Sequence, residues 1–137
     1  MVALLCSITT PVRAQLPDDA ATESFVHDVL VGEYAQAHYS EAKRKLLLQL
    51  ERCRHPGRCS GPAKAQIYVA MGMIAAQIGL SDEAKNHFAN ALSEDARVKL
   101  PSTGGSPTIT NLFKEARIRA VVVPPPPMPV PHPDSEA

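Results

Sequence analysis

The sequence predicts an all-α fold in which two helical hairpins are followed by a single closing helix. Apolar residues recur every three to four positions in several windows, which is the period of a helix with one buried face. Turn signals containing Gly, Ser or Asp separate these windows. Aromatic residues make up only 4% of the chain, and β-branched residues do not alternate with polar ones as they do in strands. At 137 residues, one domain is expected, and we place it at residues 20–120.

The first hairpin is predicted on either side of His38. Its core-facing positions, at helical spacing, are Val26, Val29, Leu30, Ala42, Leu46, Leu50 and Cys53. The residues between Arg52 and Pro62 are rich in Gly, Pro, Arg and Cys, so they predict a loop that leads to the second hairpin.

The second hairpin is clearest between Ala75 and Leu92. Its expected core positions are Ile67, Tyr68, Met71, Ala75 and Ile78 before the turn, and Ala84, Phe88, Ala91 and Leu92 after it. Gly79 suits the left-handed conformation that ends a helix. Ser81 or Asp82 can accept the free N–H groups at the start of the next helix. Two helices joined by so short a turn pack as an antiparallel hairpin.

The closing helix is predicted to begin at Ser106–Pro107, an N-cap residue followed by Pro at the first helical position. Its apolar face is made by Ile109, Leu112, Phe113 and Ala116. We interpret Gly104–Gly105 as part of the preceding turn, with a phosphate cradle as the alternative. The helix is expected to cover the end of the stack, because terminal elements of repeat proteins are atypical.

These patterns resemble the tetratricopeptide repeat (TPR) over about residues 22–119. The small and aromatic positions of that family are matched by Tyr68, Gly72, Gly79, Ala84, Phe88 and Ala91. Aligning Ala42 with Ala84 gives a first copy, in which Ala37 falls opposite Gly79, and a period of 42 residues against roughly 34 for the family. The segment from Leu100 to Arg117 is similar to the closing segment of small exported bacterial TPR proteins. The resemblance implies a right-handed stack of two hairpins plus a capping helix.

The resemblance also implies a function. In that family the first helix of each hairpin lines a concave face, so the partner-binding residues carried over to this chain are Ser24, His27, Val31, Tyr34, Gln66, Val69, Met73 and Gln77. This largely uncharged face suits an apolar or neutral peptide. For Val31, Val69 and Met73 the alternative is burial against the neighbouring helix. We therefore expect a non-catalytic adaptor for a protein or peptide partner, the alternative being a structural subunit assembled through the ends of the stack.

The N-terminus and the cysteines predict export. Residues 1–14 resemble a signal peptide, with a true start upstream of Met1 left open, and with a cytosolic N-terminal tail as the alternative. Removing Cys6 with this segment leaves Cys53 and Cys59, which in an oxidising compartment such as the periplasm are expected to form a disulfide. Free thiols, or a metal site that includes His55, are the alternatives.

Other function classes find little support in the sequence. Lys and Arg number 14, as do Asp and Glu, so the chain lacks the basic footprint of a nucleic-acid-binding protein. No familiar catalytic motif is present, we expect no cofactor, and no stretch has the ~20 apolar residues of a membrane span. His87 is expected on a helix surface. In the segment 121–137, seven prolines favour a polyproline II spacer, with a ligand for a Pro-binding groove as the alternative.

Overall fold

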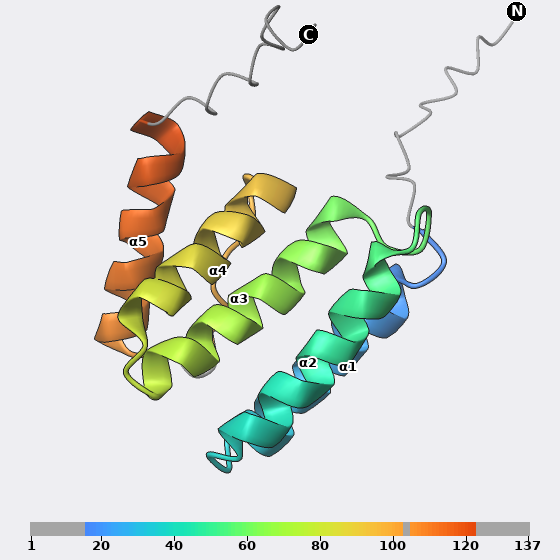
Figure 1. The fold of residues 1–137 in the computed structure, drawn as a ribbon, viewed down its shortest axis with the longest axis horizontal. Helices are drawn as coiled ribbons and strands as arrows, with labels where there is room; N and C mark the ends of the chain where they lie inside the picture. The colour runs from blue at the N-terminus through green and yellow to red at the C-terminus, as the bar shows by residue number, and fades with distance from the viewer. Residues whose placement is uncertain (1–15, 103–104, 123–137) are drawn as a thin grey trace, which may run out of the picture.

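The computed structural model describes residues 16–102 and 105–122, and these ranges are helical with no strand. The helices are α1 (Asp19–Val29), α2 (Tyr39–Arg54), α3 (Gly61–Gln77), α4 (Ser81–Glu94) and α5 (Pro107–Val122), with a π-helical turn, η1 (Leu30–Tyr34), continuing α1 (Figure 1). The prediction of an all-α fold is confirmed. The expected signal peptide, and the tail beyond Val122, lie outside the described residues.

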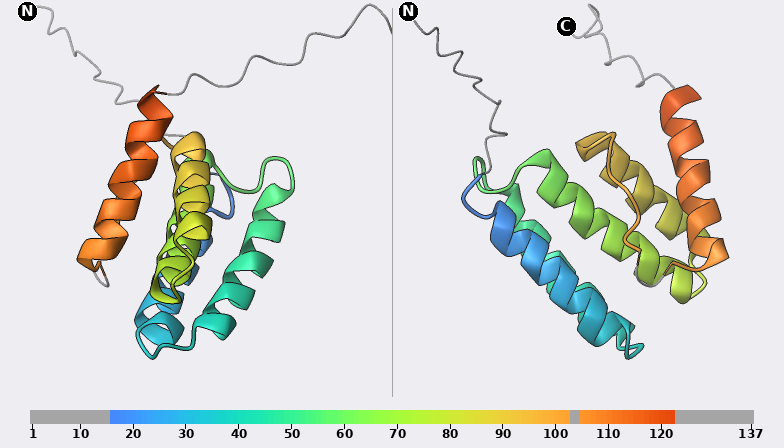
Figure 2. Two further views of the ribbon diagram at one scale, coloured as in Figure 1. Left: turned by 60° about the vertical axis from the view of Figure 1, so that its left-hand side comes forward. Right: turned by 180° about the vertical axis from the view of Figure 1, so that it is seen from behind.

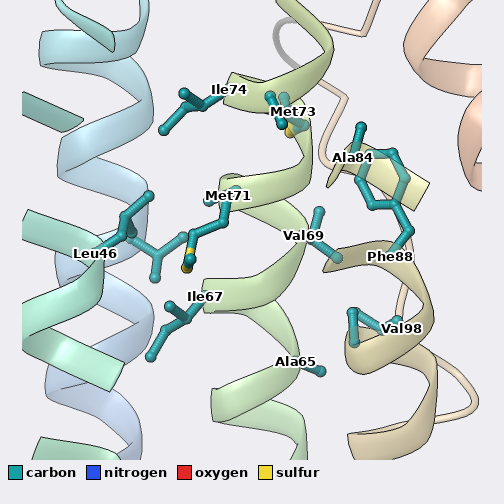
Figure 3. Packing of buried hydrophobic residues seen from close by; sticks show 14 of the residues in the cluster. Leu46, Ala65, Ile67, Val69, Met71, Met73, Ile74, Ala84, Phe88 and Val98 are labelled. Atoms are coloured by element: carbon teal, nitrogen blue, oxygen red, sulfur yellow. The ribbon is translucent and has the colours of Figure 1, made fainter. Parts of the chain in front are cut away.

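The helices pack in chain order. α1 and α2 run antiparallel, α3 contacts both of them, α4 packs against α3, and α5 packs mainly against α4 (Figures 1 and 2). α3 is thus the central helix, and its residues from Ile67 to Ala75 are almost all buried. Figure 3 shows Ile67 and Met71 pointing toward the first hairpin, whereas Met73 points to the opposite side, toward α4.

The two hairpin turns share a backbone feature. Gly79 ends the helix before the second turn with φ of 81°, as predicted, and Ala37 has φ of 60° at the aligned position of the first turn. A non-glycine residue in the left-handed region is uncommon. Its presence at the aligned position supports the internal repeat between the two hairpins.

Two local expectations for the second hairpin are wrong. Ile78 is 47% exposed, because α3 ends at Gln77 and the chain turns away from the core there. Neither Ser81 nor Asp82 caps α4 with its side chain: Leu80 is the N-cap residue and its carbonyl accepts the N–H of Ala84. Acidic residues in the first turn complement the helix dipole instead.

α5 begins as predicted, because the Ser106 hydroxyl accepts the N–H of Ile109 at 3.2 Å. Its apolar face is buried, and Phe113 meets Phe88 of α4 edge to face with ring centroids 5.3 Å apart. Between α4 and α5 the chain doubles back along the stack (Figure 2, right). We call its residues 95–102 the strap. The strap is fixed by buried Val98, whose carbonyl accepts a hydrogen bond from the Arg117 guanidinium at 2.8 Å.

Candidate partner-binding groove

A groove of about 370 Å³ lies between α1, the start of α3 and the strap. α1 lines it with Glu23, Val26 and His27, η1 with Leu30, and α3 with Pro62, Gln66 and Val69. These sets have the spacings i, i+3, i+4, i+7 and i, i+4, i+7, so each is a single stripe along its helix. The groove is therefore formed by two facing stripes, one from the first helix of each hairpin.

The strap forms the third side of the groove. Val98 and Pro101 add apolar surface, and Asp95 and Lys99 add opposite charges. One carboxylate oxygen of Asp95 accepts the N–H of Arg97 at 3.0 Å, which turns the chain at the start of the strap. With Glu23 on α1, the lining holds two carboxylates and one ammonium around a mostly apolar surface.

Three of the eight residues predicted to bind a partner line this groove: His27, Gln66 and Val69. Two more, Ser24 and Val31, are exposed on α1 and η1 but do not line it. Burial of Val31, the alternative interpretation, is wrong because this side chain is 51% exposed.

The other three predicted residues, Tyr34, Met73 and Gln77, do not line the groove. Met73 is fully buried and Tyr34 is 7% exposed, so these side chains offer a partner almost no surface. Gln77 is exposed, but its amide donates a hydrogen bond to the Tyr34 hydroxyl at 2.9 Å. For Met73 and Val69, burial against neighbouring elements was the correct alternative, although Val69 also borders the groove.

The Cys53–Cys59 pair lies at the start of α1. The two sulfurs lie at disulfide distance, 2.08 Å apart, in agreement with the predicted pairing. In the described residues, no group of three or more His, Cys, Asp or Glu side chains is arranged to hold a metal ion. The Thr22 hydroxyl lies 3.6 Å from each sulfur and accepts a hydrogen bond from the Gln49 amide at 2.9 Å. All of these side chains are buried.

Asp19, the first residue of α1, was missed by sequence reasoning. Its buried carboxylate accepts the N–H of Ser60 at 2.7 Å and the N–H of Leu16 at 3.0 Å. Burial acts to raise the pKa of Asp19, but these hydrogen bonds outweigh it and the pKa is lowered. An acidic residue at a helix start was visible in the sequence. Its partner in a loop 41 residues away was not.

His87 is not the surface residue that the sequence predicted. It is partly buried beneath Tyr68, with ring centroids 6.5 Å apart, and its Nε2 lies 3.5 Å from the Glu83 carboxylate. Burial, more than any other effect, lowers the pKa of His87. Because α3 and α4 pack closely here, a polar position of α4 becomes part of their interface, and His87 does not line the groove.

No family model, curated protein or solved structure matches this chain. No helix in the described ranges combines the length and the apolar character required to cross a bilayer.

Proposed function

We propose that this chain is a non-catalytic, TPR-like interaction module of the bacterial cell envelope, which holds a peptide segment of a partner protein in the groove between α1 and α3. The observation that carries the proposal is the pair of facing stripes. Each comes from the first helix of a hairpin, and together with the strap they form one concave, mostly apolar site.

The TPR-like assignment rests on contacts at the positions that the resemblance marked. Ala84 and Ala91 are fully buried where helices cross. A methyl group added to Gly72 would lie 2.5 Å from the Phe88 ring, so α3 and α4 approach as closely as only glycine permits. Together with the left-handed residues at both turns, these contacts are typical of a repeated helical hairpin.

The lining of the groove indicates the chemistry of the partner. A volume of about 370 Å³ is at the small end of the usual range for ligand sites, ~300–1,000 Å³. Apolar side chains cover most of its surface, and the charges stand on α1 and on the strap. We propose a short extended peptide with aliphatic side chains, and we expect neither a cofactor nor a nucleic acid.

Export is part of the same proposal. A disulfide is maintained in an oxidising compartment, which favours the periplasm. We expect a mature chain that begins near Gln15, and N-terminal sequencing of protein from the envelope fraction tests this. Recovery of the intact N-terminus from the cytosol would contradict export.

The binding proposal is tested by affinity capture from the envelope fraction followed by mass spectrometry. Gln66→Arg places a long cation in the groove, and Asn86→Arg places the same side chain on the exposed face of α4 as a matched control. Wild type and Asn86→Arg should recover the same partner, whereas Gln66→Arg should lose it with unchanged thermal unfolding. Retention of the partner by Gln66→Arg would contradict the groove as the binding site.

A second candidate function is assembly through the ends of the stack. It is favoured by exposed aliphatic residues at both ends, Leu48 on α2 (57% exposed) and Ile118 on α5 (62% exposed). If Leu48→Glu or Ile118→Glu loses the captured protein while Gln66→Arg keeps it, the chain is a structural subunit.

A further inference from the structure

The start of α1 makes several polar contacts with the disulfide loop, residues 53–60. The Asp19 carboxylate accepts the N–H of Ser60, and the N–H of Asp18 is donated to the carbonyl of Arg58 at 3.1 Å. The side chains of Asp18 and Arg58 also form an ion pair at 3.8 Å. One turn further along α1, the Thr22 hydroxyl contacts both sulfurs of the bridge. These contacts form a clamp between the disulfide loop and α1.

The same helix provides one wall of the groove. Its stripe begins at Glu23, the residue after Thr22, and ends at Leu30. α1 has 11 residues and continues as η1 for five more, and most of the stability of such short helices in proteins comes from tertiary packing. α1 therefore depends on tertiary contacts for its order. Val26 and Val29 supply packing, and the clamp fixes the position of its first turn.

The disulfide is what shapes the loop that makes these contacts. Residues 54–58 are all exposed, so no core packing holds this part of the loop in place. The bridge joins Cys53, at the end of α2, to Cys59, which is followed directly by Ser60 and α3. The bridge therefore closes the loop that places Arg58 and Ser60 beside the start of α1.

We propose that oxidation of Cys53 and Cys59 completes the groove, so that the chain becomes competent to bind its partner only after the disulfide forms. This inference rests on the proposed function of the groove. The two thiols lose two electrons and two protons to a disulfide-carrying oxidoreductase. One cysteine thiolate attacks the oxidant's disulfide and forms a mixed disulfide, and the second thiolate then displaces the oxidant as its dithiol. Binding is thereby confined to the compartment in which the bridge is stable.

The clamp is tested by hydrogen–deuterium exchange of the full chain, read by mass spectrometry. Oxidised wild type is compared with reduced wild type and with the double variant Cys53→Ser/Cys59→Ser. Amides of α1 should exchange about tenfold faster or more without the bridge, while α4 and α5 keep their protection. Unchanged exchange in α1 would overturn the proposal. So would equal acceleration in every helix, because the bridge would then support the whole fold rather than α1.

A second pair of variants tests the clamp with the disulfide intact. Asp19→Ala removes the acceptor of the Ser60 and Leu16 N–H groups, and Asp28→Ala removes an exposed carboxylate from the same helix. Asp19→Ala should accelerate exchange in α1, and Asp28→Ala should not. If the two variants change the exchange rates of α1 equally, Asp19 has no specific role in the clamp.

Capture of the partner then separates this inference from the proposed function. If reduction accelerates exchange in α1 and abolishes capture of the partner, both the proposed groove function and its gating by the disulfide are supported. If reduction frees α1 while capture persists, the partner does not use the groove and the gating proposal falls with it. If α1 stays protected while Gln66→Arg still loses the partner, only the gating by the disulfide is wrong.

Discussion

Replacing Gly72 by alanine tests how closely α3 and α4 are packed. The added methyl group would lie 2.5 Å from Cε1 and 2.7 Å from Cδ1 of Phe88. The ring has little room to retreat, because Phe88 is fully buried and meets Phe113 edge to face. Either α3 and α4 separate slightly or the Phe88 side chain leaves its preferred rotamer.

Two opposing effects set the size of the change. Overpacking a core costs about 1–3 kcal/mol, and Gly→Ala within a helix stabilises by roughly 0.5–1 kcal/mol. We therefore expect a net loss of about 0–2.5 kcal/mol. Gly32→Ala is the matched control, since a methyl group there has no neighbour within 4 Å. The difference between the two variants isolates the steric cost of about 1–3 kcal/mol.

Thermal and urea unfolding followed by circular dichroism at 222 nm measure this difference. For a domain of this size, 1 kcal/mol shifts Tm by about 4 °C, so the two variants should melt about 4–12 °C apart. Adding Phe88→Leu to Gly72→Ala should cost less than the sum of the single changes, because the clash is then relieved. If Gly72→Ala melts at or above Gly32→Ala, the packing argument is refuted.

Three further predictions concern stability. Met73→Ala should lower the free energy of unfolding by about 2–5 kcal/mol, because the side chain is fully buried; a change below ~1 kcal/mol in urea titrations would contradict that burial. Gly61→Ala should destabilise the chain, because its methyl group would lie 2.4 Å from the Glu94 carbonyl oxygen, and an unchanged melt would show that the backbone yields there. Since the pKa of Asp19 is lowered, its stabilising contribution is present above pH 3.8, its unperturbed value, and is lost as the pH falls through the folded-state pKa. The stability difference between wild type and Asp19→Ala should accordingly shrink below pH 3.8, and a constant difference from pH 7 to pH 2.5 would contradict an ionised carboxylate.

The periodic parts of the chain were predictable because each helix buries one stripe. The apolar face of α5 and the left-handed conformation of Gly79 followed from residue type and spacing alone. α3 is different, since its residues from Ile67 to Ala75 are almost all buried. The apolar run from Ile67 to Ala75 indicates this burial, because a helix that is apolar all round lies in a core. Because the sequence analysis gave α3 only one buried stripe, it placed Met73 among the partner-binding residues, whereas this side chain is buried in the core.

Features that depend on contacts between distant segments were not predictable. The π-helical turn η1 and the left-handed Ala37 lie in a turn that has neither family glycine at the aligned positions. The strap carries no periodic pattern, and its place beside α3 depends on the contact of Val98 with Arg117, 19 residues away. The Asp19 contact with Ser60 is of the same kind. Such pairs become visible only once the chain is folded.

The eight predicted residues do not share one continuous face. The groove lies between α1 and the N-terminal half of α3, and both His27 and Gln66 line it. At the end of η1 the Tyr34 hydroxyl accepts a hydrogen bond from Gln77 at the end of α3, which joins the two hairpins, and Met73 of α3 is buried. Tyr34, Met73 and Gln77 do not line the groove. The proposed peptide would therefore contact α1, the N-terminal half of α3 and the strap, rather than the full length of α3.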